Sequence, residues 1–348
     1  MSRVYMENCM MNIRHEGAPI RLMEVCGTHT SVIVRGGVRA LLPESVRLVS
    51  GPGCPVCVTG RGYIDALLAL AAQGCAICTF GDMIKVPGSA ASLAQARAQG
   101  ADVRMVYSPF DMLRLAREQP ERQFVFAAVG FETIAPVYAL LVQQLAEAQI
   151  KNARLLTALK RITPALDVLA HRGVDGFIAP GHVAAVTGWG VFAPLAHALH
   201  RPFCVAGFTP RAVIAAICDL IAQIENKTYD VHNLYPSVVT ERGNEKALAL
   251  MERVFTPGGA TWRGLGEIAK SGLYLREEFA RFDAGSRDVS EGGEDGACRC
   301  GQVLCGEITP ADCPLFGTAC TPMHARGPCM VSGEGACGIW YQCGGGAV

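Results

Sequence analysis

Two cysteines three residues apart, Cys54 and Cys57, lie in the segment Gly51-Pro52-Gly53-Cys54-Pro55-Val56-Cys57. Proline removes an amide donor and glycine admits backbone angles that other residues avoid, so this segment is predicted to be a loop. A Cys-x-x-Cys pair can bind a metal, cycle between dithiol and disulfide, or pack as small buried side chains. Glycines and prolines offer little side-chain mass for packing, which favours a functional pair. The motif alone leaves metal binding and redox chemistry open.

Other side chains with chemical potential also follow predicted strands. They are Cys26 and His29, Glu132, and His182 in Pro180-Gly181-His182. Ligands of parallel sheets bind at the carboxyl ends of the strands, so these loops and the Cys54/Cys57 loop are expected to converge on one cleft. Thiolates with imidazoles suit iron, zinc or copper, and Glu132 could orient a ligand or relay a proton. The alternatives are hydrogen-bonded loop histidines and a carboxylate at a helix start.

Half of the 16 cysteines lie between residue 298 and the end of the chain. Among them Cys313, Cys320, Cys329 and Cys337 stand between glycines and prolines, as loop ligands of a metal or an iron–sulfur cluster do. A structural zinc is the plainer alternative. Further thiols compete for the same role: Cys298, Cys300 and Cys305. Four others are expected in the core, where the Cys75/Cys78 pair lies in a strand that points its two thiols to opposite faces: Cys75, Cys78, Cys204 and Cys218.

Composition excludes several classes of protein. Lys plus Arg and Asp plus Glu number 31 each, so no basic surface for nucleic acid or an acidic membrane is expected. No apolar run is long enough for a membrane span, and residues 1–15 do not resemble a signal peptide. Many cysteines without an export signal indicate a reducing compartment, and hence the cytoplasm.

Strand and helix patterns alternate along most of the chain, which predicts α/β architecture with parallel sheets. Three units are expected: an α/β domain over 1–125, a second over 126–232, and a Cys-rich domain over 233–348. Residues 235–275 are predicted to be helical with a loop at 257–259, and 283–296 to be a linker. The strands are predicted at 20–25, 46–49, 75–80, 103–107, 122–129, 155–157, 176–179 and 203–206. The helices are predicted at 31–42, 63–73, 89–99, 137–148, 164–171, 183–199 and 210–223.

An ordered set of motifs resembles the HypD family of nickel-iron hydrogenase maturation proteins. The matching segments are Cys26-Gly27-Thr28-His29-Thr30, Gly51 to Cys57, Gly130-Phe131-Glu132-Thr133, Pro180-Gly181-His182-Val183, Trp262-Arg263-Gly264, Phe282-Asp283-Ala284, Cys313-Pro314-Leu315-Phe316-Gly317, and Gly327-Pro328-Cys329-Met330 to Cys337. Each motif is weak by itself, but their order along nearly the whole chain is specific.

The resemblance implies a scaffold on which the Fe(CN)2CO centre of the hydrogenase is assembled. It implies a small HypC-type chaperone that shares the iron, a HypE-type partner that donates cyanide, and a 4Fe-4S cluster. Carried over, Cys26 is the iron ligand, Cys54 and Cys57 are a redox or ligand pair, and the cluster is held by Cys313, Cys320, Cys329 and Cys337. His29 is a further candidate iron ligand, and Glu132 and His182 are candidates for catalytic roles. Electrons from the cluster would then reach the Cys54/Cys57 pair.

Two rival functions remain. In the first, an iron–sulfur thiol–disulfide oxidoreductase reduces a disulfide substrate through Cys54 and Cys57 and binds no cyanide or carbon monoxide. In the second, a zinc-stapled protein binds a nucleotide. The second is weaker because the chain has neither a Gly-x-x-x-x-Gly-Lys-Ser/Thr loop nor a Gly-x-Gly-x-x-Gly after a strand.

Overall fold

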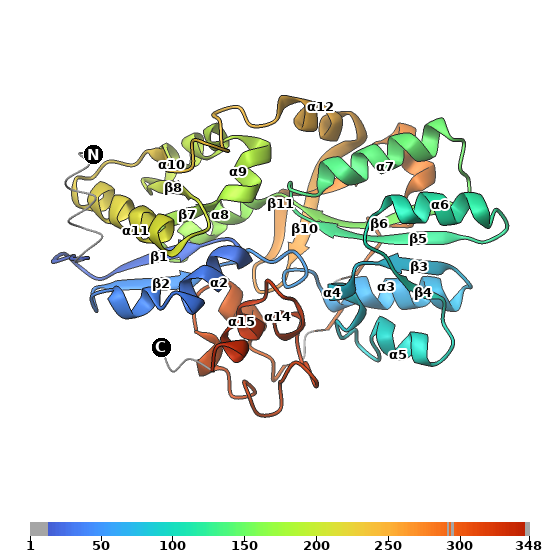
Figure 1. Ribbon diagram of the computed structural model, residues 1–348, viewed down its shortest axis with the longest axis horizontal. Coiled ribbons are helices and arrows are strands. Elements are labelled where there is room, and N and C mark those ends of the chain that lie inside the picture. Colours follow the sequence, from blue (N-terminus) through green and yellow to red (C-terminus); the bar gives the residue numbers. More distant parts are fainter. Residues whose placement is uncertain (1–12, 291, 294–295, 345–348) are drawn as a thin grey trace.

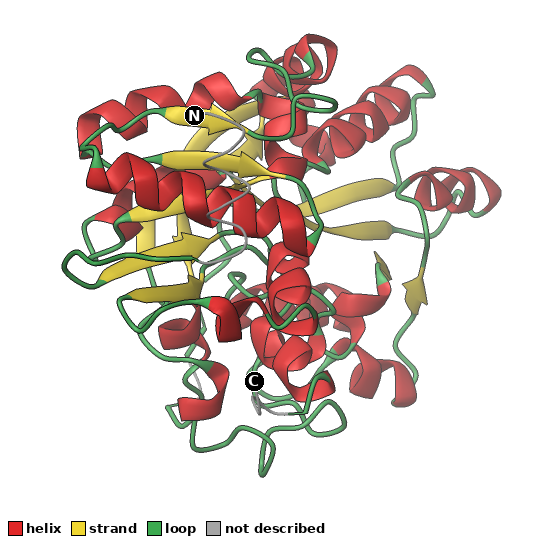
Figure 2. Cartoon of the chain, turned by 60° about the vertical axis from the view of Figure 1, so that its left-hand side comes forward, coloured by secondary structure: helices red, strands yellow, loops and turns green. Residues whose placement is uncertain are grey.

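The computed structural model describes residues 13–290, 292–293 and 296–344. Two sheets lie side by side, each covered by helices, and a C-terminal segment packs beneath them (Figure 1). Turned by 60°, the strands are seen between layers of helices (Figure 2). The predicted α/β class, with two mostly parallel sheets and a Cys-rich C-terminal region, is confirmed.

The first sheet is entirely parallel and has the strand order β2-β1-β7-β8-β9. One face packs against helices α2 and α11, and the other against α8 and α10. Its strands are β1 (Ile20–Glu24), β2 (Val46–Ser50), β7 (Gly176–Pro180), β8 (Phe203–Ala206) and β9 (Val231–Asn233). Its helices are α2 (Gly27–Arg35), η1 (Val38–Leu41), α8 (Ile162–Ala170), α9 (Gly181–Thr187), η2 (Trp189–Phe192), α10 (Ala193–Leu199) and α11 (Pro210–Glu225).

The second sheet has the order β10-β11-β6-β5-β3-β4. Four strands are parallel, and the β10–β11 hairpin joins them antiparallel to β6. Its strands are β3 (Ala76–Thr79), β4 (Val103–Met105), β5 (Phe124–Gly130), β6 (Ala153–Lys160), β10 (Phe255–Trp262) and β11 (Gly266–Leu275). Its helices are α3 (Arg61–Ala72), α4 (Gly81–Ile84), α5 (Leu93–Ala98), α6 (Phe110–Glu118), α7 (Ala135–Glu147), α12 (Glu245–Val254) and η3 (Glu277–Phe282).

The helical prediction for residues 235–275 is wrong over most of its length. Residues 235–244 are turns and loop, α12 is the one helix in this stretch, and residues 255–275 form the β10–β11 hairpin. The turn between the strands places Gly264 at φ +79° and Gly266 at φ +77°, angles that favour glycine. Pro257 is tolerated because β10 is an edge strand. Pairing between the adjacent strands β10 and β11, and of β11 with β6, outweighed the helical pattern.

Several element boundaries also differ from the predictions. Helix α2 begins at Gly27 instead of residue 31, so His29 and Thr30 belong to its first turn. The helix expected over 183–199 is broken into α9, η2 and α10 at Gly188, where φ is +83°. Part of the expected linker packs along β6, where the amide of Ala284 donates to Leu155 O at 3.0 Å.

The chain passes back and forth between the two sheets. Strands β1 and β2 lie in the first sheet and β3 and β4 in the second, and the chain returns to the first sheet at β7. Residues 1–125 therefore supply strands to both sheets. The domain boundaries near 125 and 232 stay a prediction, and the sheets do not follow them.

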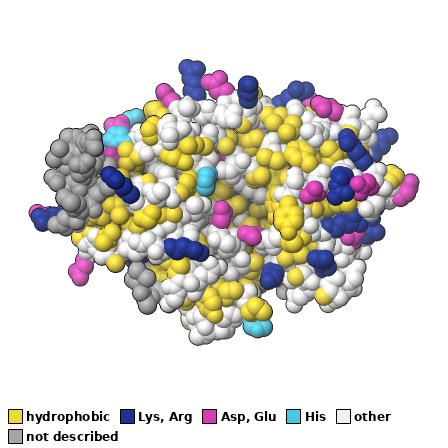
Figure 3. Space-filling model, in the orientation of Figure 1, with side chains coloured by type: hydrophobic (Ala, Val, Ile, Leu, Met, Phe, Trp, Pro, Cys, Tyr) yellow, Lys and Arg dark blue, Asp and Glu magenta, His cyan; other side chains and the backbone are white. Residues whose placement is uncertain are grey.

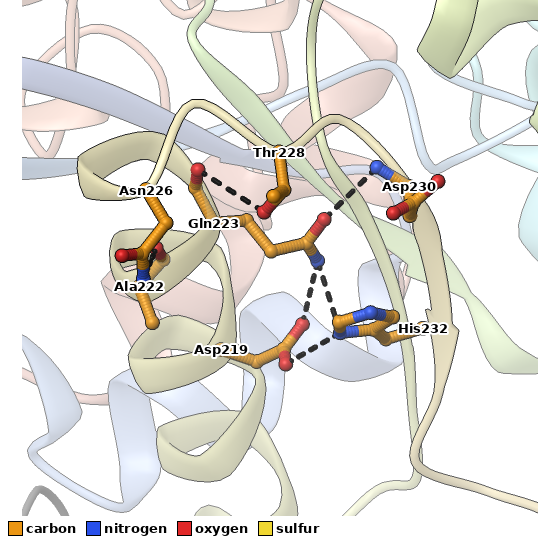
Figure 4. A network of polar contacts seen from close by, with 7 residues as sticks. All are labelled: Asp219, Ala222, Gln223, Asn226, Thr228, Asp230 and His232. Atoms are coloured by element: carbon orange, nitrogen blue, oxygen red, sulfur yellow. Dashed lines mark hydrogen bonds and ion pairs between the residues drawn. The ribbon is translucent and has the colours of Figure 1, made fainter.

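A buried polar network fixes the edge strand β9 to helix α11 (Figure 4). Asp219 Oδ1 accepts from His232 Nδ1 at 2.7 Å, and its Oδ2 accepts from Gln223 Nε2 at 2.8 Å. The amide of Asp230 donates to Gln223 Oε1 at 3.0 Å. Since Asp219 and Gln223 are both buried, these bonds satisfy groups that would otherwise lack water.

The C-terminal segment consists of short helices joined by loops: α13 (Cys300–Leu304), η4 (Pro310–Asp312), α14 (Pro328–Val331) and α15 (Ala336–Gln342). Helix α15 packs against α2, and the Arg39 guanidinium lies 5.0 Å from the centre of the Trp340 ring. The Cys-rich segment is thereby attached to the first sheet at its carboxyl edge.

The surface carries mixed charge. The face in Figure 3 shows Lys and Arg interspersed with Asp and Glu around apolar areas, in keeping with a net charge of zero. Within the described residues no single helix is long and apolar enough to cross a membrane; one pair of helices, bent by 104°, passes the same test together.

Candidate functional site

The loop that carries Cys54 lies against the backbone of Cys26. A Cβ added at Gly53 would lie 2.5 Å from the Cα of Cys26, so only glycine fits there. The amide of Gly27 points to Gly53 O at 3.4 Å, and the amide of Gly51 donates to Glu24 O at 2.7 Å. The carboxyl ends of the neighbouring strands β1 and β2 therefore bring the two predicted motifs together.

Cys54 and Cys57 are joined by a disulfide, and both are buried. Arg263, in the β10–β11 turn, binds the backbone of their loop. Its Nε donates to Cys57 O at 3.1 Å, and an Nη donates to Thr59 O at 2.9 Å. The geometry shows that the two sulfur atoms can bond within the native fold, which a dithiol–disulfide couple requires.

Cys26 is the N-cap residue of α2 and is buried. Burial raises the pKa of its thiol to about 11, and the nearby Glu24 raises it further against opposing backbone hydrogen bonds. The free chain thus holds a protonated thiol at neutral pH. Binding of a metal ion here would release that proton.

Glu24 is a functional candidate that the sequence analysis missed. Its buried carboxyl accepts from the hydroxyl of Thr30 at 2.5 Å and from the amide of Cys26 at 3.0 Å. Burial raises its pKa to about 7, against these hydrogen bonds and the charge of Arg39. A carboxyl residue at the end of an apolar strand was the available signal. This group fixes the start of α2 and can hold a proton beside Cys26.

His29 and His182 both stack on one aromatic ring. Their rings stack on Phe208 with centroids 4.7 Å and 3.9 Å away. His29 is buried, and its Nε2 donates to Gly207 O at 3.1 Å while Nδ1 has no partner. Burial lowers its pKa to about 4, so the ring is neutral with a lone pair on Nδ1. His182 remains exposed, and partial burial lowers its pKa as well.

Glu132 binds the start of a helix. Its Oε1 accepts from the amide of Ile162, the first residue of α8, at 2.9 Å, and Oε2 is buried without a partner. Burial raises its pKa to about 7. These contacts correspond to the helix-start alternative, although the unpartnered Oε2 leaves room for a second contact.

The C-terminal segment reaches the Cys26 loop through Glu334. A Cβ at Gly27 would lie 2.5 Å from Glu334 O, and Asp82 accepts from the hydroxyl of Ser332 at 3.2 Å. Partial burial and the charge of Asp82 raise the pKa of Glu334, although its side chain is largely exposed. Asp82 and Glu334 had no distinguishing sequence signal, because their proximity depends on the packing of distant segments.

Six cysteines line one small cavity in the C-terminal segment. They comprise the four predicted cluster ligands and two of the three competing residues: Cys298, Cys300, Cys313, Cys320, Cys329 and Cys337. The sulfur atoms of Cys300 and Cys329 are 2.7 Å apart. Hydrogen bonds from Cys298 and Cys329 lower the pKa of the Cys300 thiol, whereas that of Cys329 is raised.

Cys305 lies outside this cavity. Its sulfur accepts from Arg172 at 3.2 Å and faces Gly264 O at 3.2 Å. The cysteines expected in the core are indeed buried: Cys75, Cys78, Cys204 and Cys218.

The donor set of the cavity suits an iron–sulfur cluster, because thiols from loops and from the short helices α13, α14 and α15 approach it from several directions. The side chains are not arranged for a single metal ion, in the cavity or elsewhere: no three His, Cys, Asp or Glu residues of the described chain are placed to hold one. The disulfide between Cys54 and Cys57 would have to open before either sulfur bound iron.

Comparison with known proteins identifies the family. The sequence model of HypD, described as "Hydrogenase formation hypA family", matches residues 4–344. The chain is 43% identical over 332 residues to the hydrogenase maturation factor HypD of Escherichia coli K12, covering 93% of this chain and 89% of that protein. It is 42% identical over 351 residues to the HypD of Cupriavidus necator, covering 96% and 93%. The chain therefore belongs to the HypD family of hydrogenase maturation factors.

Proposed function

We propose that the chain is the scaffold on which the Fe(CN)2CO centre of a nickel-iron hydrogenase is assembled, in the cytoplasm. The observation that carries this proposal is the contact between Gly53 and Cys26, which brings an iron-ligand cysteine beside a Cys-x-x-Cys loop. A HypC-type chaperone shares the iron, and a HypE-type partner donates cyanide. The iron is cargo that the scaffold receives and passes on.

Cys26 is the scaffold's own iron ligand in this proposal. Its thiol loses a proton on binding, and Glu24, whose amide and hydroxyl partners fix its carboxyl beside the Cys26 backbone, takes up that proton. The neutral His29 and the exposed His182, which both stack on Phe208, are further candidates for contact with the iron or its ligands. Burial of Cys26 excludes water from the iron–sulfur bond.

Cys54 and Cys57 serve as the two-electron partner. Reduction of their disulfide consumes two electrons and two protons and yields two thiols, and oxidation returns them. When bound in the thiol-lined cavity by Cys313, Cys320, Cys329 and Cys337, a 4Fe-4S cluster would supply electrons one at a time. Arg263 holds the Cys54/Cys57 loop in place throughout.

The disulfide itself supports a second candidate, an iron–sulfur thiol–disulfide oxidoreductase. That enzyme would reduce an external disulfide through Cys54 and Cys57 and would hold no cyanide or carbon monoxide. Both candidates use the same loop, so an experiment must follow the diatomic ligands.

The test is an infrared spectrum of the chain purified without oxygen from its host, together with any small partner. Cyanide and carbonyl stretching bands are expected in the native complex and absent from a Cys26→Ala variant. Cys78→Ala removes a buried thiol from a different hydrophobic core, the one between the second sheet and α7. This variant should keep the bands and serves as the matched control. A sample that contains iron, acid-labile sulfide and a reducible Cys54/Cys57 pair but shows no such bands would reject the scaffold proposal in favour of the oxidoreductase.

A further inference from the structure

A cavity of about 270 Å³ opens beside β6, away from the cysteines of the C-terminal segment. Strand β11 pairs with β6 at only two positions, Gly272 with Lys160 and Leu273 with Leu159. Towards the start of β6, the segment that follows η3 lies beside the strand instead of β11. There the amide of Thr157 donates to Ser286 Oγ at 2.8 Å. The cavity occupies the opening between β6 and β11.

Its position is that of a ligand site in an α/β protein. The cavity lies at the carboxyl end of the parallel strand β6, where such folds bind small molecules. Thr59 and Gly60 form another wall, and Gly60 is the N-cap of the twelve-residue helix α3. The positive end of that helix faces the cavity.

Two cationic side chains line the cavity from different elements. Lys160 is buried, and its ammonium donates to Thr261 O at 2.6 Å and lies 5.5 Å from the centre of the Trp262 ring. Arg287 lies over the Tyr274 ring at 4.3 Å. One carboxylate, that of Glu267, lines the same space. The charged groups in the lining sum to one positive charge.

We propose that the cavity binds a small molecule through a phosphate or carboxylate group held between Lys160 and Arg287. Glu267 provides the complementary acceptor and favours a ligand that also carries an N–H or O–H donor. The site does not depend on iron. It is connected to the redox pair, because Thr59 follows Cys57 closely and both carbonyls accept from Arg263.

The experiment is a calorimetric titration of the purified full-length chain with inorganic phosphate and, separately, with malonate. Saturable binding of either probe is expected, and the one that binds more tightly identifies the preferred oxyanion. Arg287→Gln removes a charged hydrogen-bond donor and should weaken binding about tenfold or more.

Arg281→Gln is the matched control. Arg281 also lies over an aromatic ring, that of Phe282 at 4.6 Å, but does not line the cavity. It should bind the probe as the native chain does. Absence of saturable binding for both probes, or equal losses in Arg281→Gln and Arg287→Gln, would overturn the proposal. Since no iron is needed, this result is separate from the infrared test of the scaffold.

Discussion

Gly53 and Cys26 are in backbone contact: a Cβ at Gly53 would lie 2.5 Å from the Cα of Cys26. Neither side of this contact is a flexible side chain, so the overlap could be relieved only by separating the two loops. The spacing between Cys26 and the Cys54/Cys57 pair is therefore set by a residue without a side chain.

We expect Gly53→Ala to remove iron from the complex with the small partner while the acid-labile sulfide of the C-terminal segment is retained. The steric overlap should also lower the free energy of unfolding by about 1–3 kcal/mol. Infrared bands and sulfide content measure the two effects. Gly296→Ala, where an added Cβ meets open space, is the control. Normal cyanide and carbonyl bands in Gly53→Ala would show that this spacing is unimportant.

Glu132→Gln should change the pH dependence of stability. The pKa of Glu132 is raised from 4.5 to about 7 by burial, so the folded chain gives up stability as pH rises through about 7. Glutamine keeps the acceptor for the Ile162 amide and has no charge to bury. We expect little difference between the two proteins near pH 5 and a stabilisation of the variant of up to about 3 kcal/mol near pH 8. Urea unfolding at both pH values is the measurement; an equal difference at both would contradict the assignment.

Asp219→Ala should destabilise the chain by about 2–3 kcal/mol, because His232 and Gln223 lose a buried acceptor. The Cys204 thiol, which also bonds to Asp219, should become easier to ionise because a neighbouring negative charge is removed. Chemical denaturation measures the first effect. Glu118→Ala breaks an exposed ion pair with Arg114 and should cost less than about 0.5 kcal/mol. Similar losses in both variants would mean that burial of the network is unimportant.

Arg263→Lys should loosen the Cys54/Cys57 loop. One ammonium cannot reproduce the fork that binds the carbonyls of Cys57 and Thr59, and the loss should cost about 1–3 kcal/mol. Reduction of the disulfide by dithiothreitol should then be faster, as followed by thiol labelling. Arg161→Lys, which alters an exposed contact with Lys270 O, should react like the native chain. An unchanged reduction rate in Arg263→Lys would show that Arg263 does not restrain the Cys54/Cys57 loop.

Motifs whose geometry is local were predicted well. The Cys54/Cys57 segment is a loop, and Cys75 and Cys78 are buried in and beside a strand. Residues 255–275 were wrongly assigned to a helix, although β10 pairs with the adjacent β11; the contact that joins this hairpin to the sheet is made by β6, about a hundred residues earlier. Glu24 was missed because its role depends on the Thr30 hydroxyl and the Cys26 amide, which donate to its carboxyl only once the fold has buried it.

The sequence by itself determined the α/β class, the thiol-bearing loops and the Cys-rich C-terminal segment, because hydrophobic period, glycine, proline and cysteine spacing act over short stretches of chain. Only the tertiary structure decided that each sheet takes its strands from alternating parts of the chain. It also decided that Gly53 contacts Cys26 and that six thiols line one cavity. These relations arise from packing between segments far apart in sequence. A local pattern cannot encode such packing by itself, since each contact depends on the surface that another segment presents.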